Sequence, residues 1–287
     1  MKNIVARSLS GIVYVAVIVA AVLAGSWCMY LLSLLFTLAG TCEYQHLCED
    51  KSEECISPAI RAFDLMGAVL VWALLPLPQF VSLFAETPLE SLGATLSAYM
   101  IVLVLLAIYF IGRFFFAVFD SSEDPWSNLG RSILGIVYIA VPMTVLNMMS
   151  DSTMMNRMGV LMMFVLIWLN DTGAFLVGSS FGKTRLCERL SPKKSWEGFW
   201  GGMGICLVAA IIFALCTGGN VLAWAVFGLL VSATATVGDL FESLLKRSAG
   251  VKDSGKLIPG HGGILDRIDS LLFVIPVSAL FWLVASM

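Results

Sequence analysis

The residues of this chain whose types and spacing could do chemistry lie together between positions 243 and 269, SLLKRSAGVKDSGKLIPGHGGILDRID. This segment holds five Lys or Arg residues, three Asp residues and one of the two histidines of the chain. Gly238, Asp239 and Glu242 extend the polar run toward the N-terminus. Because the surrounding chain is overwhelmingly apolar, we expect so many ionisable groups only where water, an ion or a charged substrate satisfies them.

The spacing of these groups predicts two acidic helix ends. If the helix before the segment continues to about position 247, one of its faces carries four polar residues at helical spacing: Asp239, Glu242, Ser243 and Lys246. A second acidic pair, Asp266 and Asp269, lies three residues apart where the last apolar run begins. Carboxylates from two helix ends would suit a hard divalent cation, and Mg²⁺ prefers one or two carboxylates together with phosphate oxygens.

The residues between these helix ends predict a loop that binds an anion. Positions 250–263 are rich in glycine and include Pro259. Gly262 and Gly263 then lead into a helix N-terminus, where free N–H groups bind anions. The alternative is an interfacial loop with solvated charges, since cytoplasmic loops of membrane proteins are often basic.

The segment also resembles, position for position, the signature of the CDP-diacylglycerol synthase family (phosphatidate cytidylyltransferases). The matching residues are Ser243, Lys246-Arg247, Lys252-Asp253, Gly255, Pro259, His261-Gly262-Gly263, Asp266-Arg267 and Asp269. This resemblance implies transfer of the cytidylyl group of CTP to phosphatidate, giving CDP-diacylglycerol and pyrophosphate, in phospholipid biosynthesis. It covers about residues 171–269 with distinct motifs and the whole chain in hydropathy.

The elements that must position this segment are membrane helices. Of the 287 residues, 59% are hydrophobic and 13% charged, whereas roughly a quarter of the residues of soluble domains are charged. Apolar runs of membrane-spanning length occur at about 9–25, 27–42, 62–84, 94–112, 132–149, 158–178, 200–216, 221–238 and 268–286. We therefore predict an all-α polytopic protein with about nine spans and a cytoplasm-facing polar cavity. It forms one integral domain over 1–287, with a scaffold in 1–157 and catalytic helices and loops in 158–287.

The basic residues predict the orientation of these spans. The N-terminus and the loops after the even-numbered spans hold 16 of the 17 Lys and Arg residues, and the other loops hold only Arg157. By the positive-inside rule the N-terminus and those loops are cytoplasmic, in what we expect to be a bacterial inner membrane. The first 25 residues resemble a signal peptide, but eight further spans favour a retained helix. The pI near 5.4 predicts no nucleic-acid partner.

Asp171 is the next candidate functional residue. It interrupts an apolar run about ten residues from its cytoplasmic end, which is on the order of 15 Å deep. An ionisable group at that depth is expected to face a polar cavity, and the family resemblance favours the active site. The alternatives are an Asp satisfied by neighbouring helices and, in another functional class, the coupling residue of an ion-driven transporter.

The loop that follows carries a second basic motif. Ser191 and Pro192 predict a helix start, with Ser as N-cap and Pro as the first helical residue. Lys193 and Lys194 would then occupy the first turn, where the helix dipole disfavours cations, so an anion is expected to complete the site. Residues 193–198, KKSWEG, resemble a second segment of the same family.

Two glycines follow this motif at a spacing of four residues. Gly198 and Gly202 form a small-residue pair that predicts close packing of two helices. The resemblance suggests a homodimer, and this glycine-lined span is one candidate for its interface.

If the chain is such a cytidylyltransferase, we expect Asp239 and Asp266 to bind Mg²⁺, with Asp171 and Asp269 as outer or alternate ligands. A second cation beside this Mg²⁺ is the alternative to a single ion. The catalytic set is Asp239, Asp266, Lys246, Arg247, Asp269 and Asp171. Substrate contacts fall to Lys193, Lys194, Ser195, Ser243, Lys252, His261, Gly262, Gly263 and Arg267. Besides the transporter, a CTP-dependent lipid kinase and a cytidylyltransferase for another lipid phosphate remain alternatives.

Overall fold

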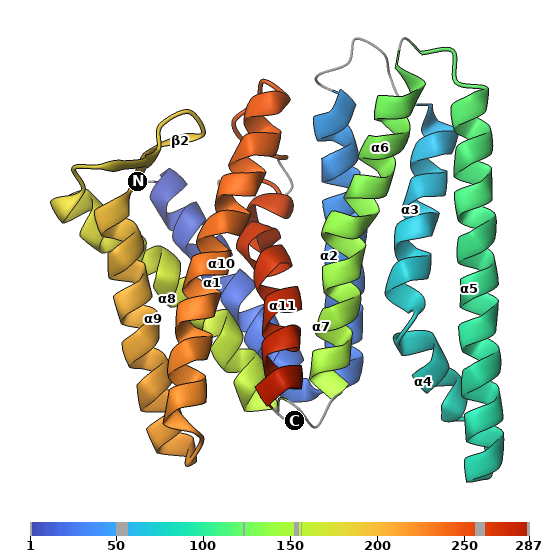
Figure 1. Ribbon diagram of the computed structural model, residues 1–287, viewed down its shortest axis with the longest axis horizontal. Coiled ribbons are helices and arrows are strands. Elements are labelled where there is room, and N and C mark those ends of the chain that lie inside the picture. The colour runs from blue at the N-terminus through green and yellow to red at the C-terminus, as the bar shows by residue number, and fades with distance from the viewer. Residues whose placement is uncertain are drawn as a thin grey trace.

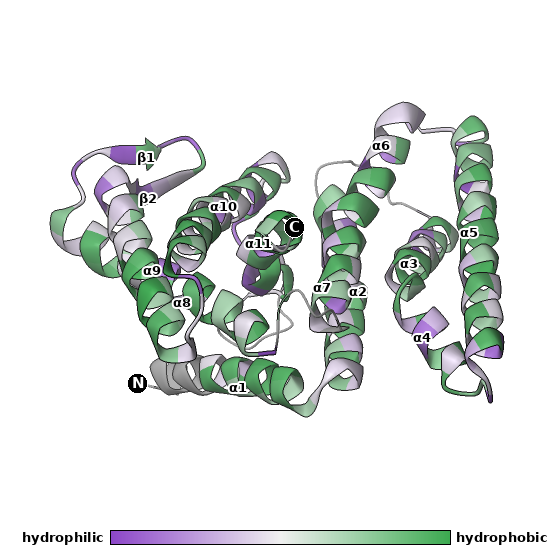
Figure 2. Cartoon of the chain, turned by 60° about the horizontal axis from the view of Figure 1, so that its bottom comes forward, coloured by the Kyte–Doolittle hydropathy of each residue, from purple (hydrophilic) through white to green (hydrophobic). Residues whose placement is uncertain are grey.

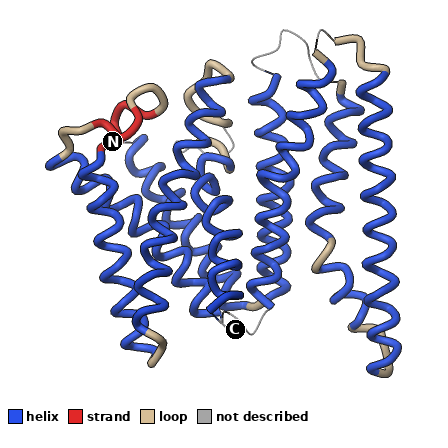
Figure 3. The backbone as a smooth tube through the Cα atoms, viewed as in Figure 1, coloured by secondary structure: helices blue, strands red, loops and turns tan. Residues whose placement is uncertain are grey.

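The computed structural model describes residues 2–49, 57–122, 124–151, 155, 157–255 and 262–285. In these residues helices form the whole architecture apart from one β-hairpin and the connecting turns (Figure 3). The elements are α1 (Lys2–Ala24), α2 (Ser26–Glu49), α3 (Pro58–Ala73), α4 (Pro76–Ser82), α5 (Pro88–Val118), α6 (Pro125–Gly135), the π-helix η1 (Ile136–Ala140), α7 (Val141–Asp151), α8 (Arg157–Phe181), β1 (Arg185–Cys187), β2 (Ser191–Ser195), α9 (Trp196–Thr217), α10 (Val221–Ser248) and α11 (Leu265–Ala285). The all-α polytopic prediction is confirmed.

Each predicted apolar run coincides with one helix or with consecutive helices. Among the described residues, six helices are long and apolar enough to cross a membrane. The number is seven if α3 and α4, which meet at an angle of 56°, form one broken span. The count of nine spans stays a prediction.

The helices place the candidate loops on one side of the molecule. Figure 1 shows the start of α1, the β-hairpin, the end of α10 and the start of α11 on that side. The end of α11 lies on the opposite side. The helices are mostly apolar along their length, whereas the hairpin is largely hydrophilic (Figure 2). Polar elements far apart in the sequence are thus gathered at one face.

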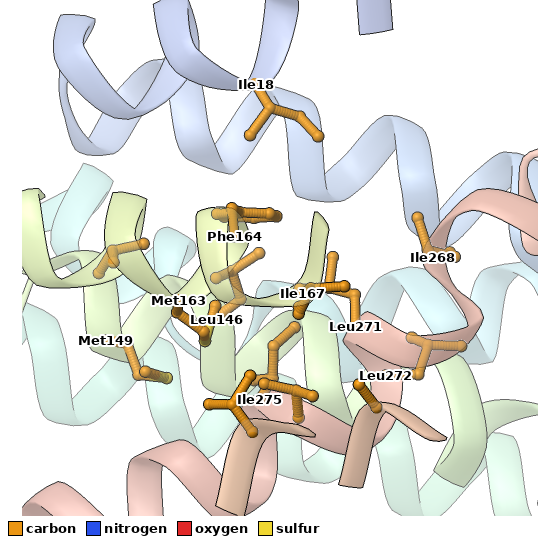
Figure 4. Close-up of a cluster of buried hydrophobic side chains, with 14 of the residues drawn as sticks. Ile18, Leu146, Met149, Met163, Phe164, Ile167, Ile268, Leu271, Leu272 and Ile275 are labelled. Atoms are coloured by element: carbon orange, nitrogen blue, oxygen red, sulfur yellow. The ribbon is translucent and has the colours of Figure 1, made fainter. Parts of the chain in front are cut away.

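Two apolar cores hold the helices together. The larger core contains residues of helices α1, α2, α7, α8, α9, α10 and α11. Its centre includes Leu146 of α7, Phe164 of α8 and Ile275 of α11 (Figure 4). The smaller core joins α3, α5 and η1, with Tyr109 fully buried. The candidate catalytic helices α8, α10 and α11 therefore share one core with α1 and α2.

The first two predicted spans are joined by a one-residue turn. Only Gly25, at a φ of 116°, separates α1 from α2, and a side chain there would be strained. The two helices diverge from this turn (Figure 2). Ile18 of α1 is fully buried in the larger core, and Figure 4 shows it facing Phe164 of α8.

The predicted helix start at Ser191 is wrong. Residues Ser191–Ser195 form β2, which pairs antiparallel with β1, and Lys193 and Lys194 are therefore strand residues. The helix begins at Trp196, because Ser195 is the N-cap and its Oγ accepts a hydrogen bond from the Gly198 N–H at 3.1 Å. A serine four residues further along thus provides the cap that was assigned to Ser191.

The predicted close packing of glycines is confirmed between α8 and α9. A Cβ atom at Gly202 would lie 2.7 Å from Oδ1 of Asn170, and one at Gly198 would lie 2.7 Å from the carbonyl oxygen of Ala174. Both distances are too short for any residue with a side chain. The two helices approach closely at these positions, as in small-residue packing of membrane helices.

Candidate active site

Three carboxylates from α10 and α11 meet at the polar face of the molecule. Asp239, Glu242 and Asp269 each offer an oxygen, and these atoms lie within 4.8 Å of one another. Gly238 allows the two helices to approach, because a Cβ atom there would lie 2.7 Å from the carbonyl oxygen of Asp269. The cluster therefore depends on a glycine next to one of its own carboxylates.

Glu242 is the most buried member of this cluster. Its exposed fraction is 1%, and its Oε1 has no hydrogen-bond partner among the described residues. A buried acceptor without a partner is costly, so a ligand is expected to satisfy it. Oxygen atoms grouped at this spacing fit a divalent cation.

Lys246 connects this cluster to Asp266. Its Nζ forms an ion pair with Glu242 one turn earlier on α10 and donates to Oδ1 of Asp266 at 2.7 Å. Asp266 also accepts hydrogen bonds from the backbone N–H of Gly263 at 2.8 Å and of Ser254 at 3.1 Å. Glu242 and Lys246 are two of the four residues expected on one face of this helix. The helix extends to Ser248, so the predicted helix through Lys246 is confirmed.

The structure groups the proposed metal ligands differently from the sequence hypothesis. Asp239 lies with Glu242 and Asp269, whereas Asp266 is held by Lys246 and two backbone N–H groups. Glu242 was absent from the predicted ligands. Its spacing of three residues from Asp239 on a helix was the signal that could have included it.

A cavity of about 630 Å³ opens beside Asp239, between α8, the hairpin, α9 and α10. Its lining contains five of the residues selected from the sequence: Asp171, Lys193, Lys194, Ser195 and Asp239. Asp171 is exposed on α8, and its neighbour Asn170 is buried and accepts a hydrogen bond from Ser232 Oγ at 2.6 Å. The cavity also has apolar lining from Phe175, Leu186 and Phe199. It can therefore receive a ligand with both anionic and apolar parts.

The hairpin carries two lysines to this cavity. Lys194 forms an ion pair with Asp239 across it, and Lys193 lies on the same strand. The base of the hairpin is fixed by Glu197, whose carboxylate accepts from the backbone N–H groups of Lys183 and Thr184, both at 3.1 Å. The lysines therefore project from an anchored strand rather than from a helix terminus.

The other candidate residues lie around the end of α10 and the start of α11. Arg247 is exposed and donates to the carbonyl oxygen of Val251 at 3.1 Å, and Lys252 is exposed. Ser243 is half-buried on α10. The carbonyl oxygen of Arg267 accepts a hydrogen bond from Tyr14 of α1 at 2.9 Å.

The glycine pair before α11 has the conformation expected of a loop. Gly262 has a φ of 81°, in the left-handed region that favours glycine, and Gly263 is buried. The predicted helix N-terminus is confirmed, since α11 begins at Leu265. His261 lies outside the described residues.

The anion at this helix N-terminus comes from the chain itself. Glu43 of α2 accepts hydrogen bonds from the backbone N–H groups of Ile264 at 2.9 Å and Leu265 at 2.8 Å. Glu43 follows the second apolar run of the sequence, a position that fits a polar cavity and an interfacial cap equally well. It lies more than 200 positions from its partners, and no local pattern points to this pairing.

Comparisons with known proteins agree with the signature. A sequence model described as the cytidylyltransferase family matches residues 5–285. A phosphatidate cytidylyltransferase of Bacillus subtilis is 36% identical over 217 residues, which are 74% of this chain and 75% of that protein. A phosphatidate cytidylyltransferase of Haemophilus influenzae is 44% identical over 128 residues, 42% of this chain and 44% of that protein. One of Staphylococcus aureus is 45% identical over 120 residues, 41% of this chain and 46% of that protein. The aligned regions thus span less than half of the latter two proteins.

Proposed function

Since this chain belongs to the cytidylyltransferase family, we propose that it transfers the cytidylyl group of CTP to phosphatidate, forming CDP-diacylglycerol and pyrophosphate. The observation that carries the proposal is the cavity of about 630 Å³, where Lys193, Lys194 and Asp239 share a lining with apolar side chains. Phosphatidate has an anionic head and acyl chains, and its chemistry matches both parts of this lining.

The reaction brings two anions together. An oxygen of the phosphatidate phosphate attacks the α-phosphorus of CTP. The bond between that phosphorus and the oxygen that bridges the α- and β-phosphates breaks, and pyrophosphate leaves. The attacking phosphate oxygen is already anionic, so no general base is needed. Catalysis therefore depends on alignment and on charge neutralisation. Lys193 and Lys194 supply positive charge at the cavity, and Lys246 and Arg247 supply it at the end of α10.

Mg²⁺ is the cofactor we propose. The carboxylates of Asp239, Glu242 and Asp269 would hold it, because they offer clustered oxygens and one buried acceptor without a partner. Asp266, the other ligand of the sequence hypothesis, borders this group through Lys246. When bound, the ion would neutralise phosphate charge and help to align the two substrates.

Substrates are proposed to enter from two directions. CTP would come from the cytoplasm, to which the hairpin side faces under the positive-inside rule. Phosphatidate would enter sideways from the bilayer, because Phe175 lines the cavity and is 71% exposed on α8. Because the relatives compared above are bacterial proteins, we propose that this membrane is a bacterial inner membrane.

A homodimer would have to use a surface other than the glycine face of α9. Gly198 and Gly202 already contact α8 within one chain. The outer face of α9 carries exposed Trp200, Ile212 and Leu215, which suit either lipid or a second copy.

The position of the label in the lipid product tests this function. Purified protein with phosphatidate would be given CTP labelled at the α-phosphorus or at the γ-phosphorus. We expect the α-label in the lipid phase and the γ-label in pyrophosphate. A γ-labelled lipid would identify a lipid kinase. An α-labelled lipid formed only from another lipid phosphate would identify that lipid, and not phosphatidate, as the acceptor. If neither label enters lipid, a flux assay with and without Asp171 would test the transporter alternative.

A further inference from the structure

Glu43 is a buried carboxylate that the proposed reaction does not use. It lies on α2, in the scaffold half of the chain, and its exposed fraction is 7%. Its three hydrogen-bond partners all belong to residues 254–265. A charged group is buried in such a place only when polar partners compensate for its lost hydration.

These partners lie on both sides of the signature loop. On the far side, the Ile264 and Leu265 N–H groups donate to Oε1 and Oε2 of Glu43 at 2.9 and 2.8 Å. On the near side, Ser254 Oγ donates to Oε2 at 3.3 Å. One carboxylate thus ties together the two described ends of the loop between α10 and α11.

The same loop ends also hold Asp266. Ser254 donates its backbone N–H to Asp266 and its hydroxyl to Glu43, and Gly263 donates its N–H to Asp266. Glu43 and Asp266 therefore divide the free donors at the start of α11 between them. Moving Glu43 would therefore also displace Ser254 and the start of α11, which orient Asp266 toward Lys246.

Two glycines of the signature provide an independent observation. A Cβ atom at Gly255 would lie 2.7 Å from Oε1 of Glu43, and one at Gly263 would overlap Oε2. Neither position could carry a side chain while Glu43 stays in place. Part of the glycine content of the signature is thus explained by a residue of the N-terminal half.

We propose that Glu43 is a positioning residue, which fixes the start of α11 and the Ser254 turn and so aligns Asp266 and Lys246 with the carboxylates of α10. This inference rests on the proposed function for its kinetic consequence only. Residues that orient the groups around a metal typically change affinity or activity by roughly 10- to 100-fold when they are replaced.

Glu43→Gln tests this role with little change in volume. Ile264 and Leu265 each donate to a different oxygen of Glu43, and in Gln one of these oxygens becomes an NH₂ group, which would face an N–H donor. Gln45→Ala is the matched control, because Gln45 lies on the same helix and donates to the carbonyl oxygen of Arg61 instead. Glu43→Asp keeps the carboxylate on a shorter side chain and tests rescue.

Hydrogen exchange and kinetics would be measured on the full chain in lipid nanodiscs. In Glu43→Gln we expect faster exchange confined to the amides of residues 251–255 and 262–268, and kcat lowered by roughly tenfold or more. Glu43→Asp should recover part of both, and Gln45→Ala should match the wild type. Wild-type exchange and kcat in Glu43→Gln would overturn the proposal. Faster exchange in all helices would also overturn it, since the role would then be general folding. If wild-type protein transfers no cytidylyl group, the proposed function fails while the exchange result still decides the positioning role.

Discussion

At the scale of single residues, the site is a set of carboxylates held in different ways. Glu242 is buried with one free oxygen, Asp239 pairs with Lys194, and Asp266 is held by Lys246 and backbone N–H groups. These environments fit two roles under the proposed function: Asp239, Glu242 and Asp269 would hold the cation, and Asp266 would fix the start of α11.

Asp239→Asn and Asp266→Asn test the two carboxylates of the sequence hypothesis. Each change removes a negative charge and keeps the shape, so we expect the rate of cytidylyl transfer to fall by at least about 100-fold. The amount of folded protein in the membrane should not change. Transfer would be measured in vesicles beside helix content by circular dichroism. Near-normal rates in either variant would remove that residue from the site.

Single residues also show how far the sequence alone could reach. Asp239, Lys246 and Asp266 stand out because they are charges in an apolar chain, and each takes part in an ion pair of the candidate site. Glu43 could not be assigned, because its partners are brought to it only by packing of α2 against the rest of the larger core. Sequence spacing predicts contacts within a helix and says nothing of such distant ones.

At the scale of elements, the hairpin and its helix differ from the expectation. Both Ser191 and Ser195 precede residues that can start a helix, and the sequence favoured the one followed by proline. The structure uses Ser195, since residues 191–195 pair with β1. The choice depends on strand pairing, which a local capping pattern does not contain.

The α8–α9 packing can be tested with two glycines of one helix. Gly202→Val would place atoms against Asn170, and such overpacking typically destabilises by about 1–3 kcal/mol. Gly204 is exposed and has no atom near an added Cβ, so Gly204→Val is the control. Thermal unfolding in detergent should show a lower midpoint for Gly202→Val alone. Equal midpoints for the two variants would contradict the packing described here.

Helices α3 and α5 share a buried ion pair that the sequence does not predict. Asp64 of α3 pairs with Arg113 of α5 at 3.0 Å and accepts from Tyr109 at 2.9 Å and Ser132 at 2.6 Å. Arg113 and Asp64 were visible only as charges near the ends of apolar runs. Their pairing depends on the angle between α3 and α5, so the sequence could not predict it.

Asp64→Asn should destabilise the protein by about 3–5 kcal/mol, because it removes the negative charge that pairs with the buried Arg113. The double variant Asp64→Leu with Arg113→Met removes both charges and should lose less stability than Asp64→Asn. Equilibrium unfolding in detergent micelles measures the difference. A double variant less stable than Asp64→Asn would contradict a charge-pair explanation.

At the scale of the whole molecule, the chain is a helical membrane protein with its polar groups on one side. Hydropathy predicted this, because a bilayer requires long apolar helices whatever their packing. It could not give the two separate cores or the break between α3 and α4. Those features depend on side-chain fit between helices.

The parity of the predicted span count gives a prediction for the end of the last span. With a cytoplasmic N-terminus and nine spans, the end of α11 would lie on the outer side. Alkaline phosphatase fused after residue 287 should therefore be active, and a fluorescent protein fused at the same point should be dark. The reverse pattern would contradict the combination of nine spans with a cytoplasmic N-terminus.

Under the proposed function, the protein transfers the cytidylyl group of CTP to phosphatidate and requires Mg²⁺. The most direct measurement follows α-labelled CTP into the lipid phase with purified protein and phosphatidate, in Mg²⁺ and in EDTA. We predict labelling in Mg²⁺ that EDTA abolishes and added Mg²⁺ restores. Folded protein that binds CTP and labels no phosphatidate in Mg²⁺ would contradict the account.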